Sequence, residues 1–253
     1  MPDTMTMLLA GFFLPLFPLS AAFNGLYAGC RRPLVRSVLL LAWPQIGAAA
    51  LSTPITPIPD WFPILALATS ILYGVRALAL RELGLWTSFL ATSSWSLLWI
   101  PAYHDAAVPT LHLYALGFSV PLVLLALLTA ALENRFGAAY AGLYGGLAQM
   151  LPRLSGVLVF VVLAVIATPV FPAFFAMLST IVTSVSAAPA VAAGVAGSWL
   201  IWSWAGARLL QGVIVGPGRE GKVRDLSLGA TWAYAMVLAL LVVAGAAWTG
   251  GMR

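Results

Sequence analysis

The chain has 253 residues, of which 62% are hydrophobic and only 8% are charged, and its mean hydropathy is +1.01. Soluble domains contain about 45–50% apolar and about 25% charged residues, so this composition excludes an ordinary soluble domain. The formal charge of +5 does not indicate nucleic-acid binding, because the sequence has no basic patch interleaved with aromatic residues. The single cysteine, Cys30, excludes an intrachain disulfide and a cysteine metal cluster.

Eight apolar segments follow one another along the chain, and a helix that spans a membrane needs about 20 such residues. The segments are 5–28, 37–53, 61–80, 84–103, 111–132, 154–178, 189–213 and 227–248. The N-terminus has no basic region and carries Asp3, so we expect a first span there and not a cleaved signal. The sequence therefore predicts an all-α integral membrane protein, with residues 1–253 forming a single polytopic domain of about eight transmembrane helices.

Prolines interrupt two of these segments. Pro44 and Pro54 are expected to break the short second segment, and Pro169 and Pro172 lie inside the sixth. A proline-broken helix at membrane depth frees backbone carbonyls, which must find partners in protein or water because lipid offers none. We expect one such broken helix within 154–178. The glycine-rich stretch 139–152 is too short for a span and is expected to connect two helices at the membrane surface.

The few charged residues are unevenly distributed among the loops. If the N-terminus is external, the loops after odd-numbered spans and the adjoining helix ends are cytoplasmic, and they hold nearly all of the 12 Lys and Arg. These residues are Arg31, Arg32, Arg36, Arg76, Arg81, Arg135, Arg153, Arg208, Arg219, Lys222 and Arg224; only Arg253 lies outside. The bias follows the positive-inside rule and predicts that both termini are external. We expect a bacterial-type inner (cytoplasmic) membrane.

Four stretches of sequence carry a resemblance to a known family. They are Ile64–Ser94, which ends Ala91-Thr92-Ser93-Ser94; Leu111-His112-Leu113-Tyr114-Ala115; Gly145-Gly146-Leu147-Ala148-Gln149-Met150-Leu151-Pro152; and Ala167–Phe175 with the later Arg208–Gly212 and Gly216-Pro217. Their order resembles the proton-conducting, antiporter-like membrane subunits of respiratory complex I. Relatives of those subunits occur in cation antiporters, membrane-bound hydrogenases and inorganic-carbon accumulation complexes. The third stretch is the most specific of the four.

The resemblance covers only about half of a standard family member and is similar to its C-terminal half. It implies a single antiporter-like repeat plus flanking helices, and inverted repeats of broken helices are how many transporters build a site at mid-membrane. It also implies a subunit of a larger complex linked to the proton-motive force. The expected partners are other membrane subunits, including a full-length antiporter-like paralogue, a soluble zinc- or redox-bearing subunit, and the lipid bilayer, with no nucleic acid.

Five residues are candidates for a proton relay or polar path: His112, Ser93, Ser94, Arg76 and Glu133. His112 matches the family's histidine; it could relay a proton or only stabilise the start of its helix. The two serines could line a hydrated path or only hydrogen-bond to the backbone or a neighbouring helix. Arg76 could snorkel to the interface or bind a partner's carboxylate. Glu133 could pair with Arg135 or face a lateral helix.

Two positions depart from the family's pattern. The lysine expected one turn after the histidine is Leu116, and the Lys or Glu expected in the broken helix falls near Met177. Buried charges in a membrane are costly and are normally functional, so their loss bears on mechanism. We infer that this chain either conducts no protons or conducts them through a partner's groups. We expect no catalytic residue, cofactor or metal site, and no catalysis by the chain alone.

Two further features have ordinary explanations. Trp61, Trp86, Trp99, Trp232 and Trp248 lie near segment ends, as in the aromatic belt at a membrane interface. His104 and Asp105 are expected to form a solvated external turn, with proton entry as a less favoured alternative. The parent complex stays open at this point: an inorganic-carbon uptake complex, a respiratory or hydrogenase-type complex, or a scaffold that moves no ions.

Overall fold

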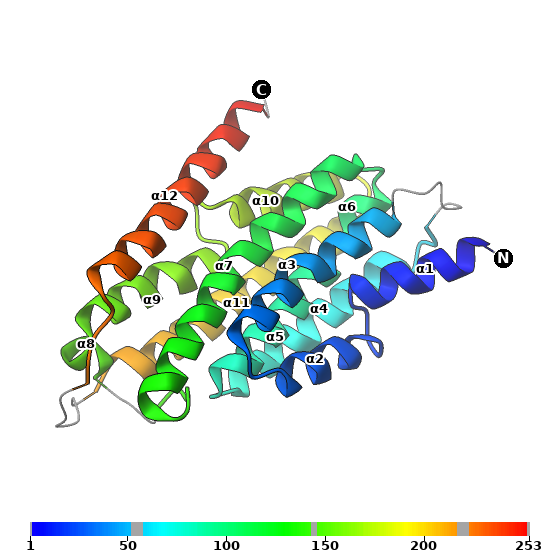
Figure 1. The fold of residues 1–253 in the computed structure, drawn as a ribbon. Coiled ribbons are helices and arrows are strands. Elements are labelled where there is room, and N and C mark those ends of the chain that lie inside the picture. The colour runs from blue at the N-terminus through cyan, green and yellow to red at the C-terminus, as the bar shows by residue number, and fades with distance from the viewer. Residues whose placement is uncertain (1, 52–57, 143–145, 217–222, 252–253) are drawn as a thin grey trace.

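The structure is a computed structural model, and it describes residues 2–51, 58–142, 146–216 and 223–251. The described part of the chain is all-helical, as predicted (Figure 1). The helices are α1 (Pro2–Phe13), α2 (Ser20–Gly29), α3 (Pro33–Ala50), α4 (Phe62–Ala79), α5 (Leu83–Ser96), α6 (Trp99–Tyr103), α7 (Val108–Phe136), α8 (Leu147–Met150), α9 (Pro152–Val165), α10 (Pro172–Val185), α11 (Pro189–Ile214) and α12 (Leu228–Gly251).

Five of these helices are long and apolar enough to cross a membrane: α3, α4, α7, α11 and the segment Leu228–Trp248 of α12. The apolar helices α9 and α10 are shorter and follow each other across the break predicted in the sixth segment. A helix or a pair of helices lies along every predicted segment. The number of membrane crossings and the orientation of the termini stay predictions.

The first segment, expected to be continuous over 5–28, is instead two helices, because Pro15 and Pro18 lie between α1 and α2 and cannot donate a backbone N–H. Side chains of other helices bond the backbone groups that this break leaves free. The indole nitrogen of Trp99 donates to the carbonyl of Leu14 at 3.0 Å, and the amide of Phe17 donates to the hydroxyl of Thr69 at 3.1 Å. The sequence contains these prolines, but we did not predict this interruption.

The expected break at Pro44 is wrong. Helix α3 continues through Pro44 from Pro33 to Ala50, so one missing N–H does not end the helix here. Pro54 lies outside the described residues. The fourth segment also differs from a single continuous helix, because a turn at residues 97 and 98 separates α5 from α6.

The break between α9 and α10 has partners for its freed carbonyls. The indole nitrogen of Trp199 in α11 donates to the carbonyls of both Ile166 and Ala167, each at 3.1 Å. Within the break, Ala167 and Val170 have positive φ angles of 56° and 87°, which non-glycine residues rarely adopt. A Cβ at Gly245 of α12 would collide with the carbonyl oxygen of Val170. The connection is therefore closely held between α11 and α12.

Helix α5 is the centre of the bundle. It packs against α2, α4 and α7, and most of its side chains are fully buried, including Trp86 and Trp95. Trp99 in α6 is also fully buried, so Trp86 and Trp99 belong to the core and not to an interfacial belt, whereas Trp61 and Trp232 are 56% and 67% exposed. Helix α12 lies on the outside and extends beyond the bundle at its C-terminal end (Figure 1). It exposes large apolar side chains along its length, among them Trp232, Met236 and Leu240.

The Trp199 bonds predict a specific loss of stability. Trp199→Phe keeps the ring that packs against Phe174 but leaves two carbonyls without a donor, so we expect it to cost about 1–3 kcal/mol. Thermal unfolding of the detergent-solubilised protein would measure this as a lower midpoint. Trp204→Phe is the matched control, because Trp204 is exposed on the same helix and its indole has no hydrogen bond within the described residues. Equal midpoints for the two variants would contradict the assignment.

Candidate functional site

A network of uncharged polar groups crosses the core, and Ser93 is its centre. The Ser93 hydroxyl donates to the carbonyl of Ser70 at 2.7 Å and accepts from the indole nitrogen of Trp202 at 2.7 Å. The hydroxyls of Ser70 and Ser93 are 3.1 Å apart. Ser93 therefore joins α4, α5 and α11, and its hydrogen-bonding capacity is used. Ser94 is different, because its hydroxyl donates to the carbonyl of Ala91 in its own helix at 3.0 Å.

A second set of buried bonds connects α2 to the same core. The side-chain amide of Asn24 donates to the hydroxyl of Thr92 at 3.0 Å, and the hydroxyls of Ser20 and Tyr73 are 2.8 Å apart. All of these groups are neutral. Among the buried residues that the structure describes, Arg36 is the one charged side chain. The interior is thus polar enough to join helices but contains almost no group whose charge could change.

His112 lies in the second turn of α7 and is half-buried. Its Nδ1 is 2.5 Å from the side-chain oxygen of Gln45 in α3, and the amide nitrogen of Gln45 donates to the carbonyl of His112 at 3.2 Å. Gln45 therefore holds both the ring and the backbone of this residue. Sequence patterns could not identify Gln45 as the partner of His112, because the two residues are 67 positions apart.

Glu133 lies near the other end of α7 and pairs with Arg36 of α3, with Nη1 and Oε1 3.3 Å apart. Local pairing with Arg135, one of the two expected alternatives, is not what the structure shows, since Arg135 donates instead to the carbonyls of Ala131 and Arg224. Arg36 also donates from Nε to the carbonyl of Cys30 at 2.6 Å and lies over the ring of Tyr27. Sequence analysis counted Arg36 only as a loop cation.

The Arg36–Glu133 pair lines a cavity of about 400 Å³ at this end of the bundle. Arg31 and Glu82 also line this cavity, so two arginines and two carboxylates share it. His112 lies 21 positions from Glu133 along the same helix, which corresponds to about 30 Å at 1.5 Å per residue. The two titratable candidates therefore lie near opposite ends of the bundle, and the structure does not bring them together.

Arg76 lies in the last turn of α4 and is exposed. Its guanidinium carbon is 5.0 Å from the ring centroid of Phe89 and 5.9 Å from that of Tyr73. Cation–π contact of this kind is worth about 0.5–1 kcal/mol at exposed sites. Arg76 has no ion pair in the described part of the chain, so the hypothesis that Arg76 binds a partner's carboxylate stays open.

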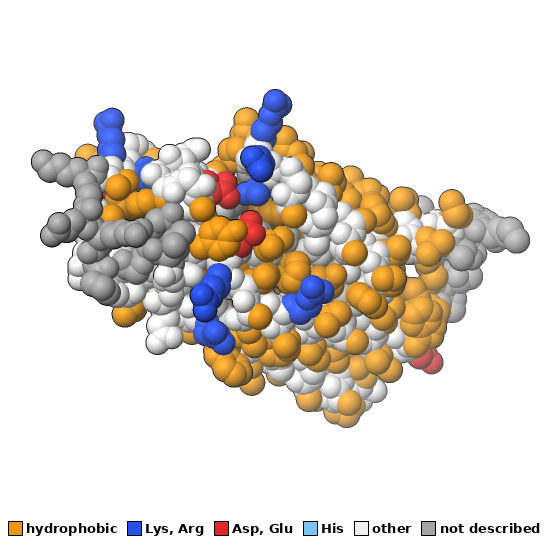
Figure 2. Space-filling model, turned by 90° about the horizontal axis from the view of Figure 1, so that it is seen from below, with side chains coloured by type: hydrophobic (Ala, Val, Ile, Leu, Met, Phe, Trp, Pro, Cys, Tyr) orange, Lys and Arg blue, Asp and Glu red, His pale blue; other side chains and the backbone are white. Residues whose placement is uncertain are grey.

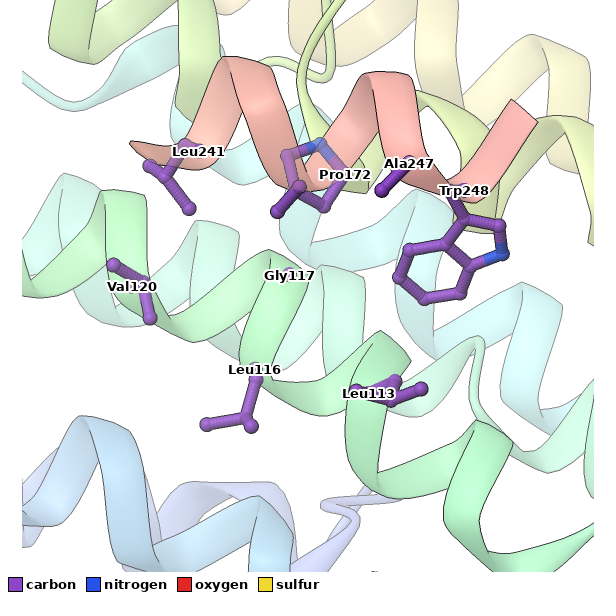
Figure 3. A pocket seen from close by; sticks show the side chains of 9 residues that line it. Leu113, Leu116, Gly117, Val120, Pro172, Leu241, Ala247 and Trp248 are labelled. Atoms are coloured by element: carbon purple, nitrogen blue, oxygen red, sulfur yellow. The ribbon is translucent and has the colours of Figure 1, made fainter. Parts of the chain in front are cut away.

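The resemblance implies a lysine at position 116, but this position holds a leucine and its surroundings are also apolar. Leu116 lines a groove of about 550 Å³ between α7, the start of α10 and α12, together with Leu113, Val120, Leu241 and Trp248 (Figure 3). Met177, at the other such position, is almost completely buried in α10. The described residues that line the groove around Leu116 include no charged side chain.

The predicted external turn has partners on other segments. The hydroxyl of Tyr103 donates to the carboxylate of Asp60 at 2.7 Å, and Nε2 of His104 is 3.5 Å from the hydroxyl of Ser184 in α10. His104 is half-buried and is thus less solvated than expected. Over the described residues, no three His, Cys, Asp or Glu side chains are grouped so that they could hold a metal ion.

Charge is distributed unevenly along the bundle. On the face shown in Figure 2, the visible Arg side chains lie in the half that carries α8 in Figure 1 or near the middle, and the opposite end is mainly hydrophobic. This agrees with the sorting of cations that the sequence analysis used. Which side of a membrane this end faces stays a prediction.

The fold is shared with chains of three solved membrane complexes. A chain of respiratory complex I from Thermus thermophilus matches with a TM-score of 0.77 and 22% identity, over 93% of this chain and 52% of that one. A chain of the membrane-bound sulfane sulfur reductase, an archaeal respiratory membrane complex, matches with a TM-score of 0.79 and 16% identity, over 95% and 51%. A chain of the Mrp complex from Dietzia sp. gives 0.65 and 18%, over 85% and 42%.

No family model and no curated protein sequence matches the chain. The chain spans about half the length of the structural neighbours. At these identities the likeness shows the fold, which is that of a multi-pass membrane chain from such complexes. The specific similarity to a C-terminal half stays a prediction.

The Arg36–Glu133 pair predicts a difference between two carboxylates of one cavity. Glu133→Gln leaves the buried guanidinium of Arg36 without its anionic partner, so we expect it to lower stability by about 1–3 kcal/mol. Glu82→Gln, in the same cavity but outside any ion pair of the described residues, should change stability by less than about 0.5 kcal/mol. Thermal unfolding of both variants in one detergent would measure the difference, and equal losses would refute the importance of the pair.

Proposed function

We propose that this chain is a non-redox membrane subunit of a multi-subunit complex linked to the proton-motive force, in which it acts as a truncated antiporter-like subunit. The shared fold with chains of three membrane complexes supports this proposal. The observation that carries it is an interior with almost no charge: the buried groups that connect α2, α4, α5, α7 and α11 are serines, a threonine, an asparagine, a tyrosine and indoles, and Arg36 is the one buried charged residue among those described.

Such an interior holds helices together but offers no site for a coupled charge change. Coupling a proton to another process needs a group whose protonation alters the local free energy, and a neutral hydroxyl does not titrate near neutral pH. The Arg36–Glu133 pair lies near one end of α3 and α7, and His112 near the opposite end of α7. Between these two levels the described interior holds no buried charged side chain, so the chain either conducts no protons or conducts them through a partner's groups.

Two parent complexes fit this role. In an inorganic-carbon uptake complex, an accessory subunit without its own mid-membrane charges would support a soluble, zinc-bearing partner. In a respiratory or hydrogenase-type complex, partner subunits would perform the redox chemistry. We favour the first, because loss of the mid-membrane charges is hard to reconcile with a redox-driven pump. A scaffold that conducts no ions is the remaining candidate.

Purification through a tag on this chain tests the assignment. In a mild detergent we expect other multi-pass subunits to co-purify, and mass spectrometry would identify them. A soluble zinc protein would indicate carbon uptake, and flavin or iron–sulfur proteins would indicate respiration. An equally tagged, unrelated multi-pass protein from the same membrane is the control. Purification of the chain without partners, under conditions that keep other complexes of that membrane intact, would refute the subunit role.

A substitution at His112 distinguishes a structural role of this residue from a role as proton relay. The bonds to Gln45 suggest a structural role, so we expect His112→Ala to lower the stability of the complex while leaving its rate per assembled complex within about twofold. Gln45→Leu removes the same contact and keeps the imidazole, so it should lower stability in the same way. If His112→Ala abolishes proton-dependent activity and Gln45→Leu does not, His112 is a relay and the supporting role is wrong.

A further inference from the structure

A cavity of about 380 Å³ lies where α4 and α11 end, close to the connection after α7. Arg81 and Arg208 line it, and both side chains are exposed. The rest of its lining is mainly apolar and includes Ala77, Leu78 and Leu209. The cavity therefore combines two cations with a hydrocarbon surface.

The charge of this cavity is not balanced by its own lining. No Asp or Glu is among the described residues that line it, whereas the cavity beside α3 holds Arg31 and Arg36 together with Glu82 and Glu133. Neither Arg81 nor Arg208 forms an ion pair or a side-chain hydrogen bond in the part of the chain that the structure describes. The two guanidinium groups are thus available to an external anion.

The ends of the two helices do not supply that anion in full. The C-terminal carbonyls of α4 and α11 carry partial negative charge, and cations nearby are favourable. Each helix end corresponds to about half an elementary charge, which is less than the charge of two arginines. Helix-end stabilisation also gives no reason for the apolar side chains that line the cavity together with the two arginines.

An apolar surface leads from the cavity along α11. Leu200, Trp204 and Arg208 follow one another at four-residue spacing and therefore lie on one face of the helix. Leu200 is 72% exposed and Trp204 is 61% exposed. A ligand that fits this arrangement has an anionic head at the arginines and a hydrocarbon tail along α11.

We propose that the cavity binds the phosphate headgroup of an anionic phospholipid through Arg81 and Arg208, with an acyl chain lying along Leu200 and Trp204. Guanidinium groups bind phosphate oxygens in a bidentate geometry, and anionic lipids attract basic residues at the membrane surface. The proposal needs only that the chain lies in a membrane. It is independent of the proposed parent complex and of any proton movement.

Native mass spectrometry of the full chain, purified with the subunits that accompany it, tests this site. After delipidation, the protein would be titrated with phosphatidylglycerol, with zwitterionic phosphatidylcholine and with inorganic phosphate. We expect the wild type to retain phosphatidylglycerol over phosphatidylcholine. Arg81→Gln/Arg208→Gln should lower phosphatidylglycerol binding by about 30-fold, the effect of losing two basic residues near an anionic surface.

The matched control is Arg31→Gln/Arg32→Gln, which removes the same charge from the same end of the bundle but leaves this cavity intact. It should keep the binding of the wild type, and Arg81→Lys/Arg208→Lys should keep more binding than the glutamine pair. Circular dichroism and an unchanged elution volume would show that each variant is folded. Equal losses in both glutamine pairs would overturn the site, and so would displacement of the lipid by inorganic phosphate at equal concentration.

Discussion

The structure depends on one constraint: every backbone group that a broken helix leaves free must be bonded by another part of the protein. Lipid supplies neither donors nor acceptors, and each unsatisfied group would cost several kcal/mol. Tryptophan side chains meet this need at two of the breaks, between α1 and α2 and between α9 and α10. Trp199 donates to the carbonyls left free after α9, and Trp99 donates to the carbonyl of Leu14 between α1 and α2. Trp43 adds a bond to the carbonyl of Phe12 at 3.2 Å.

This use of indoles explains why a chain with 10 tryptophans keeps several of them away from the surface. An indole offers one N–H donor and a large apolar body, so it fills a core and bonds one or two carbonyls at the same time. Trp202 and Trp95 do the same for serine hydroxyls within the network around α5. Position near a segment end therefore does not by itself identify a residue of an interfacial belt, as the buried Trp86 and Trp99 show.

Sequence patterns predicted those features of the fold that depend on the composition of a single segment. The apolar runs predicted an all-helical bundle, and Pro169 and Pro172 predicted where the sixth segment breaks. Pro15 and Pro18 also mark the interruption between α1 and α2. It was not predicted, because the residues around these prolines form a continuous apolar run. Pro44 shows the reverse case, since one proline did not end α3.

Contacts between distant segments could not be predicted in this way. Arg36 and Glu133 are 97 positions apart, and Gln45 and His112 are 67 apart. Both pairs depend on which faces α3 and α7 turn toward each other, and local periodicity leaves that rotation open when a helix is apolar on all sides. The candidate residues could thus be identified from their residue types in the sequence, whereas their partners could be identified only from the packing of the helices.

The spacing of these two pairs limits what the chain does alone. Both join α3 to α7, and the two pairs are separated by about 30 Å along α7 but only about 14 Å along α3. Between them the described interior offers hydroxyls, amides and indoles, which order water but hold no charge near neutral pH. A lysine at position 116 would place its charge against an apolar groove, which is unfavourable, whereas leucine fits the groove. Between the two pairs, the described interior therefore holds no buried charged side chain that could couple proton movement to a change of charge.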